Sequence, residues 1–138
     1  MTIYIFDTDH LNLYGRKNLV LMIRLFAANV RLTTTAINVE EQVKGRLAQI
    51  AEAKDGAKKS IAYQRLVETV TLLSEFNILQ YCAKSHKIYE TLKAECTSVG
   101  TQDLRIASIA LANNAVLLTR NIQDFNQIPG LIIEDWSI

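Results

Sequence analysis

The chain lacks the residues on which disulfide-rich and turn-rich proteins depend. Only two of its 138 residues are Cys, one is Pro and five are Gly. Two cysteines without CxxC spacing, and with no ligand-like His close to either, do not form a disulfide framework or a zinc site. We therefore interpret Cys82 and Cys96 as buried or partly buried free thiols of a reducing compartment. So little Pro and Gly also argues against an all-β sandwich, which needs many tight turns.

Long apolar runs and an excess of charge are missing as well. The longest apolar stretch, Leu19–Phe26, is interrupted by Arg24 and is far shorter than the ~20 residues of a membrane-spanning helix. The N-terminus has no basic segment followed by an apolar run, as a secretory signal would have. We therefore expect a cytoplasmic protein that does not enter a membrane. The formal net charge is +1, so any attraction to phosphate must come from local patches.

The sequence does have enough apolar residues for one hydrophobic core. Hydrophobic residues make up 49% and charged residues 21% of the chain, as in ordinary globular proteins. No repeat or linker divides it, so we predict one domain over residues 1–138. Short apolar runs predict strands at Ile3–Phe6, Arg31–Thr33, Ile78–Tyr81, Ala115–Thr119 and Leu131–Ile133. Strands joined through helices pair mostly in parallel, which predicts a three-layer α/β/α domain with a central, mostly parallel sheet of four to five short strands.

Helical periodicity fills the segments between these strands. Asn18–Ala28 is apolar on nearly every face, and we expect it to be deeply packed. In parallel sheets ligands bind beyond the carboxyl ends of the strands, where Asp7 and Asn121 are expected. Helices are predicted at His10–Tyr14, Asn18–Ala28, Ala36–Ala53, Ile61–Phe76, Ser85–Cys96 and Asp103–Asn113, with polar turns at Asp55–Lys59 and Asn121–Asn126.

Four acidic residues are candidates for a shared site, although each also has a structural explanation. Asp7 is a helix-capping residue, Glu41 belongs to a solvated helix surface, and Asp124 can hydrogen-bond a turn. Asp103 lies in a first helical turn, where a negative side chain gains about 0.3–1 kcal/mol from the helix dipole. Carboxylates brought together repel one another unless a cation neutralises them. Oxygen ligands without Cys or paired His favour Mg²⁺ or Mn²⁺.

Four motifs occur in a defined order along the whole chain: IFDTDHL at Ile5–Leu11, VEEQVKG at Val39–Gly45, DLRIA at Asp103–Ala107 and LTRNIQDF at Leu118–Phe125. Each motif is weak alone, but the ordered set, together with the ending Leu131–Trp136, resembles the PIN-domain ribonucleases. It is most similar to the VapC-type toxins of bacterial toxin–antitoxin modules.

The resemblance implies which of these residues are functional. Asp7 and Asp103 match two metal-binding acids of the family, and Glu41 matches the helix glutamate, because it stands four residues before Gly45. The fourth position stays open between Asn121 and Asp124. The expected metal ligands are thus Asp7, Asp103, Asn121 and Asp124, and the expected catalytic acids are Asp7, Glu41, Asp103 and Asp124.

The same resemblance implies a Mg²⁺- or Mn²⁺-dependent endoribonuclease that hydrolyses phosphodiester bonds of tRNA or rRNA. The metal would activate water and offset charge on the phosphate oxygens. Neither His10 nor His86 has an obvious acid–base partner in the sequence, so a metal-free histidine mechanism is not expected. The implied partners are a cognate antitoxin and a second copy in a homodimer. Helices Leu19–Phe26 and Ile61–Phe76 are candidate faces for either, with core packing as the alternative.

Five further residues are candidates for contact with the substrate. Lys44, Arg46 and Arg120 stand near the acids in sequence and can bind phosphates, although each can equally be ordinary surface charge. Thr8 and Thr119 can position a water molecule or a ligating carboxylate, or can serve only as capping residues.

Two other functions remain open at the level of sequence. The same fold can act as a catalytically weak module that binds RNA or a partner, and Asn121, in the place of an acid, is the one hint of this. Asp7-Thr8-Asp9 after a strand also resembles the nucleophile motif of phosphohydrolases and phospho-acceptor receivers. That chemistry usually needs a Lys after a late strand, where this chain has Thr119-Arg120-Asn121.

Overall fold

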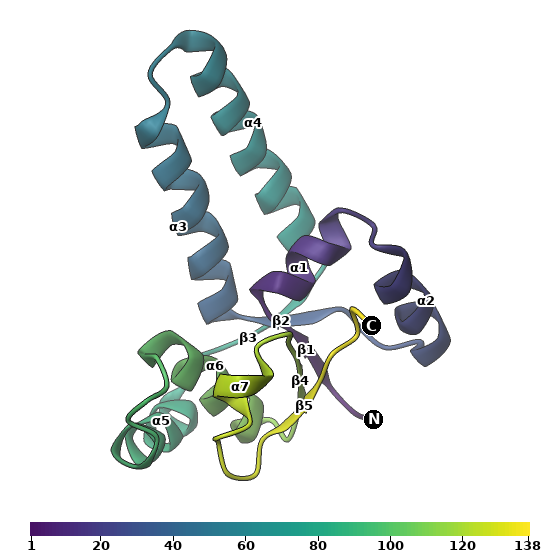
Figure 1. The fold of residues 1–138 in the computed structure, drawn as a ribbon, viewed down its shortest axis with the longest axis vertical. Coiled ribbons are helices and arrows are strands. Elements are labelled where there is room, and N and C mark those ends of the chain that lie inside the picture. Colours follow the sequence, from purple (N-terminus) through teal and green to yellow (C-terminus); the bar gives the residue numbers. More distant parts are fainter.

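The computed structural model describes all 138 residues and contains a five-stranded sheet with seven helices (Figure 1). The strands lie in the order β3-β2-β1-β4-β5, and every neighbouring pair is parallel. The predicted α/β class and parallel sheet are therefore confirmed. The strands are β1 (Tyr4–Phe6), β2 (Thr33–Thr35), β3 (Asn77–Leu79), β4 (Val116–Leu118) and β5 (Ile132–Glu134).

The helices lie close to the predicted segments, with differences at their ends. The expected polar turn at Asp55–Lys59 is wrong, because α4 already begins at Gly56, with the Asp55 side chain accepting a hydrogen bond from the Lys58 N–H at 2.8 Å. The expected turn at Asn121–Asn126 contains one helical turn instead. The helices are α1 (Thr8–Gly15), α2 (Leu19–Ala28), α3 (Ala36–Glu52), α4 (Gly56–Leu73), α5 (Ala83–Glu95), α6 (Thr101–Ala112) and α7 (Ile122–Phe125).

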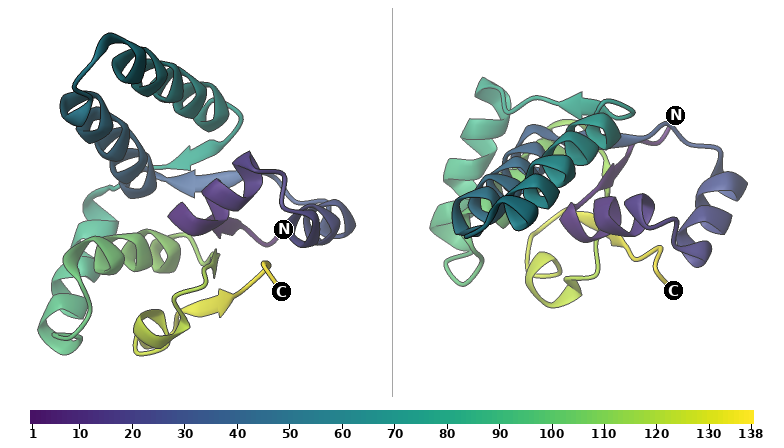
Figure 2. Two further views of the ribbon diagram at one scale, coloured as in Figure 1. Left: turned by 45° about the horizontal axis from the view of Figure 1, so that its top comes forward. Right: turned by 90° about the horizontal axis from the view of Figure 1, so that it is seen from above.

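Alternation along the strands divides the core between the two faces of the sheet. Successive side chains of a strand point to opposite faces. Ile5 and Leu117 accordingly belong to a core packed with α5 and α6, whereas Phe6 and Leu118 belong to a second core packed with α1, α2 and α4. Figure 2 shows these two groups of helices apart from each other, with the sheet between them. This is the predicted three-layer arrangement.

Strand β2 is displaced by two residues from its prediction. It consists of Thr33, Thr34 and Thr35, all of them buried, instead of Arg31–Thr33. Threonine suits a strand because it is branched at Cβ, and the Thr34 hydroxyl donates a hydrogen bond to the Phe6 carbonyl at 2.7 Å. Thr35, the last residue of the strand, is also the N-cap of α3.

Helix α2 is far less buried than its composition predicts. Only Leu21 is buried, whereas the side chain of Phe26 is 90% exposed and that of Leu19 is 71% exposed. The expected deep packing is therefore wrong: α2 lies at the margin of the fold and presents one face to it. The sequence shows that a helix is apolar, but not how many neighbours surround it.

Helices α3 and α4 run side by side as a long hairpin that projects from the sheet (Figures 1 and 2). Along α4, Ile61, Val67 and Val70 are each at least half exposed. At the base of the hairpin α4 approaches α1 closely, because a Cβ on Gly15 would lie 2.9 Å from a methyl group of Leu72.

Two smaller features complete the comparison with the sequence. Both cysteines are free thiols, as predicted; Cys96 is buried, but Cys82 is exposed, contrary to expectation. None of the seven helices combines the length and the apolar character that crossing a bilayer requires.

Candidate active site

The predicted acids from three distant segments meet in one cavity at the carboxyl edge of the sheet. Chain order reverses between β1 and β4, and open parallel sheets bind ligands at such a reversal. A cavity of about 150 Å³ opens there. Its walls come from Asp7 and the start of α1, from α3 and α6, and from Asn121 and α7 after β4. The lining residues are Asp7, Thr8, Asp9, Asn38, Glu41, Asp103, Ile106, Asn121 and Phe125.

Asp7 is held in a fixed orientation at the start of α1. It directly follows Phe6 of β1 and is the N-cap of the helix. One carboxylate oxygen, Oδ1, accepts hydrogen bonds from the backbone N–H of His10 at 2.9 Å and from the His10 ring at 3.1 Å. The predicted capping role is therefore present, and it leaves Oδ2 without a partner from the protein. Capping and ligand binding use different oxygens of the same side chain.

Glu41 is held by Thr8, the residue after Asp7, which is itself hydrogen-bonded to Asn38. The Thr8 hydroxyl donates to Oε1 of Glu41 at 3.2 Å and accepts from the side-chain amide of the buried Asn38 at 3.4 Å. Burial raises the pKa of Glu41, the Thr8 hydrogen bond opposes this, and the negative charges of Asp103 and Asp7 raise the pKa further. Glu41 therefore lies within electrostatic reach of both other acids.

The pKa of Asp103, on the opposite wall of the cavity, is also raised by burial and by neighbouring acids. Asp103 lies in the first turn of α6. Burial raises its pKa, and the charges of Asp124 and Asp7 raise it further. The surroundings of Asp103 thus disfavour its ionised form in the absence of a cation. Repulsion of this kind is what a bound cation relieves.

The donor set fits Mg²⁺ or Mn²⁺ better than any softer ion. All the polar side chains that line the cavity offer oxygen atoms, and neither Cys nor His lines it. No three His, Cys, Asp or Glu side chains converge as a complete ligand cage. Mg²⁺ does not need one, because it commonly takes one or two carboxylates and keeps several waters.

The two candidates for the fourth position have different places. Asn121 lines the cavity, whereas Asp124 does not. The side-chain amide of Asn121 donates to Oδ2 of Asp124 at 3.1 Å, which leaves the amide oxygen of Asn121 available to the cavity. Asp124 thus orients Asn121 and adds negative charge near Asp103.

The predicted substrate-binding residues are only partly brought to the site. Thr8 lies in the cavity wall. Thr119 is fully buried and accepts a hydrogen bond from the Asn121 N–H at 3.0 Å, so it shapes the loop and is closed to solvent. Lys44 and Arg120 are exposed and line neither this cavity nor the larger one beside it. Arg46 belongs to the larger cavity.

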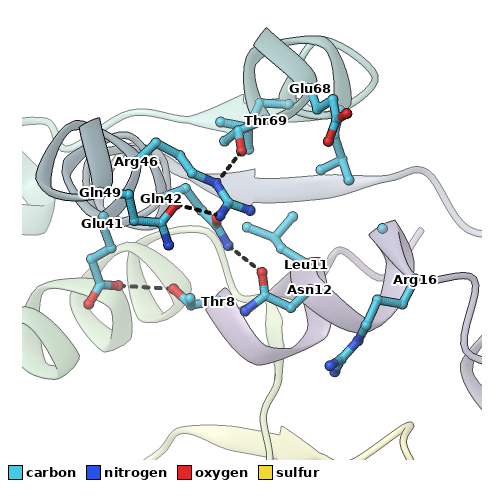
Figure 3. A pocket seen from close by; sticks show the side chains of 14 residues that line it. Thr8, Leu11, Asn12, Arg16, Glu41, Gln42, Arg46, Gln49, Glu68 and Thr69 are labelled. Carbon is cyan, nitrogen blue, oxygen red and sulfur yellow. Dashed lines mark hydrogen bonds between the residues drawn. The ribbon is translucent and has the colours of Figure 1, made fainter. Parts of the chain in front are cut away.

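The larger cavity, of about 590 Å³, adjoins the acidic one between α1, α3 and α4. Thr8 and Glu41 belong to both, so they form the boundary between them. Figure 3 shows their hydrogen bond at one side of the cavity, and the Arg46 guanidinium on another wall, where it donates to Thr69 at 2.8 Å and to Gln49 at 3.1 Å. The cavity has a mainly polar lining that extends from the acids to Arg16.

Sequence reasoning missed three residues of the acidic site. Asn38 and Asp9 line the cavity, and His10 contacts Asp7 from behind. Spacing could have revealed His10, because it stands three residues after a helix-capping acid and thus in the same turn. Asn38 carried no signal, since its contact with Thr8 joins two segments 30 residues apart.

Comparison with known proteins finds relatives along the whole chain. No protein-family model matches the chain. The chain is 31% identical to Ribonuclease VapC1 of Haemophilus influenzae over 144 aligned positions, which cover 98% of both sequences. It is 35% identical to the tRNA(fMet)-specific endonuclease VapC of Salmonella typhimurium over 59% of this chain and 65% of that protein. The solved structure of VapBC-1 from nontypeable H. influenzae superposes with a TM-score of 0.77 at 26% identity, covering 99% of this chain and 100% of that one.

Proposed function

Since this chain belongs to the VapC ribonuclease family, we propose that the cavity lined by Asp7, Glu41 and Asp103 is where it hydrolyses RNA as an endoribonuclease. The observation that carries this assignment is the convergence of the three acids. They come from segments far apart in the sequence, they line one cavity, and the pKa of Glu41 and of Asp103 is raised by burial and by the neighbouring acids. Ribonuclease relatives favour this reading over the phospho-acceptor alternative.

We propose Mg²⁺ or Mn²⁺ as the cofactor, held by Asp7, Asp103 and the amide oxygen of Asn121. Such an ion, when bound, supplies Lewis acidity for the attack of water on phosphorus and for the charge on the leaving oxygen. Asp7 offers Oδ2, because Oδ1 is occupied by His10. Asp124 holds Asn121 in place from outside the cavity.

Glu41 is the proposed proton acceptor for the attacking water. Thr8 holds its Oε1, which leaves Oε2 without a protein partner. Its raised pKa makes the carboxylate a better base than an exposed glutamate, since catalytic efficiency rises as the pKa approaches the working pH. No side chain needs to form a covalent bond with phosphorus in this scheme.

The proposed substrate is a tRNA, because the Salmonella relative is a tRNA(fMet)-specific endonuclease. The larger cavity continues from Glu41 and Thr8 toward Arg46 and Arg16, and it can hold nucleotides that flank the cleaved bond. Arginine recognises phosphate oxygens in a bidentate geometry. Arg120, exposed beside Asn121, is a second candidate for the RNA backbone.

A cognate antitoxin is the expected protein partner, because solved relatives are VapBC pairs. We propose that it covers the exposed apolar side chains of α2 and α4. Phe26, Leu19 and Val67 are each more than half exposed, and a stable soluble chain benefits from covering them. A homodimer is the other proposed use of this surface.

We also propose that residues 1–138 act as a single cytoplasmic domain.

The decisive experiment is cleavage of bacterial RNA by the purified chain freed of any partner. We expect discrete cuts with Mg²⁺ or Mn²⁺, mapped as new 5′ ends, that vanish with EDTA and in Asp7→Asn. Glu52→Gln, which neutralises an exposed acid at the end of α3, is the matched control and should cut normally. RNA binding without cleavage under any metal would contradict the proposal and favour the binding-module reading.

A further inference from the structure

His10 is a fully buried imidazole whose two nitrogens both have partners. Its Nδ1 lies 3.1 Å from Oδ1 of Asp7, and its Nε2 accepts a hydrogen bond from the backbone N–H of Trp136 at 3.1 Å. The ring also meets Phe6 edge to face, with centroids 6.5 Å apart. His10 thus joins an acid of the proposed active site to the C-terminal segment, 126 residues later.

The Trp136 contact decides which ring nitrogen carries the proton. A backbone N–H can only donate, so Nε2 must present its lone pair, and a neutral imidazole then carries its proton on Nδ1. That proton points at Oδ1 of Asp7. Asp135, whose Oδ1 is 3.7 Å from Nε2, is beyond hydrogen-bond distance and accepts from Ser137 instead.

The C-terminal segment is itself firmly anchored, which makes the Trp136 N–H a fixed point. The Trp136 ring packs against Tyr4 of β1, with ring centroids 4.9 Å apart and planes tilted by 42°, and its indole N–H donates to Glu134 at 2.9 Å. Arg24 of α2 donates to main-chain oxygens of Asp135 and Ile138 at 2.8 and 2.9 Å. The position of Trp136 is therefore set by β1, α2 and the end of the chain together.

We propose that His10 is a positioning residue, which holds Oδ1 of Asp7 so that Oδ2 faces the cavity in the orientation that a divalent cation requires. Two donors on one oxygen, the His10 backbone N–H and the Nδ1–H, fix the rotation of the carboxylate more tightly than a helix cap alone. Partners that orient a metal ligand in this way commonly change metal affinity 10- to 100-fold, roughly, when they are removed. This role rests on the proposed metal-dependent function.

Mn²⁺ binding to the full chain, measured by isothermal titration calorimetry, tests the proposal without relying on RNA cleavage. His10→Leu keeps the volume but removes both hydrogen bonds, and we expect its Mn²⁺ affinity to fall roughly 10- to 100-fold. His10→Asn places an amide N–H near the position of Nδ1, and we expect it to restore most of that affinity. Leu92→Ala, at a buried position of α5 in the core on the other face of the sheet, is the control for a purely structural loss, so it should lower the melting temperature and leave Mn²⁺ affinity unchanged.

Long-range ¹H–¹⁵N NMR of the wild-type chain supplies an independent readout. We expect the His10 ring to show a protonated Nδ1 and a bare Nε2. A proton on Nε2 in place of Nδ1 would overturn the proposal even if His10→Leu fails to fold. A folded His10→Leu chain that binds Mn²⁺ as tightly as wild type would overturn it as well.

The two proposals fail in different ways. A wild-type chain that binds Mn²⁺ but cuts no RNA would refute the proposed function, while the affinities of the variants would still decide the role of His10. A wild-type chain that binds no Mn²⁺ would refute both.

Discussion

Replacing Asp103 with Asn separates metal binding from the stability of the fold. Burial raises the pKa of Asp103, and the charges of Asp124 and Asp7 raise it further, so its surroundings favour a neutral side chain when no metal is bound. Asn is neutral and nearly the same size. We therefore expect Asp103→Asn to melt at the same temperature as wild type in EDTA, or higher, although it removes a metal ligand.

The size of the metal effect follows from linkage. At a Mn²⁺ concentration of 100 times Kd, binding stabilises the folded state by about 2.7 kcal/mol. A chain of 138 residues has an unfolding entropy of about 0.29 kcal/mol/K, so that stabilisation raises Tm by roughly 9 °C. If the variant binds about 100-fold more weakly, the same Mn²⁺ concentration supplies about 0.4 kcal/mol and shifts Tm by only about 1.4 °C.

Differential scanning calorimetry with and without Mn²⁺ measures both quantities on the same samples. Glu52→Gln removes a negative charge outside the cavity and should show the full wild-type shift. A large Mn²⁺ shift retained in Asp103→Asn would refute Asp103 as a ligand. A clear loss of stability in EDTA would refute the claim that its charge is unfavourable in the metal-free chain.

Four further changes test other parts of the structure. Thr8→Val removes the hydroxyl that holds Glu41, and we expect kcat for RNA cleavage to fall roughly 10-fold with the melting temperature preserved. Asn121→Asp adds a carboxylate to the cavity, so calorimetry should show tighter Mn²⁺ binding. Leu21→Ala deletes the one buried side chain of α2 and should cost about 2–5 kcal/mol in denaturant unfolding. Phe26→Ser, at an exposed position, should leave cleavage unchanged but weaken antitoxin capture in a pull-down.

The sheet could be predicted because its strands carry a local signal. Ile3–Phe6 and Ala115–Thr119 are short apolar runs, and both contain strands of the structure, β1 and β4. Strand β2 was displaced because threonine serves both strands and helix caps. The burial of α2 could not be predicted, because burial depends on how many elements surround a helix and not on its own periodicity.

Three acids that line the cavity could be predicted from the sequence, but not the groups that hold them. The order of the motifs placed Asp7, Glu41 and Asp103 together, and all three line the cavity. The role of His10 was invisible because its second partner, the Trp136 N–H, is a backbone group at the other end of the chain. Backbone donors have no sequence signature, so contacts of this kind appear only in three dimensions.

The structural and functional explanations of these acids are not alternatives. Asp7 is the N-cap of α1, and Asp103 and Asp124 lie in the first turns of α6 and α7. Helix N-termini favour negative charge, so they offset part of the repulsion among these acids before any metal binds. Glu41 lies inside α3 and caps no helix itself, and its stabilising donor is the hydroxyl of Thr8, the first residue of α1. A chain can assemble a cluster of carboxylates only if each is supported in this way, and at Asp7 and Glu41 the supporting donors engage one oxygen and leave the other without a protein partner.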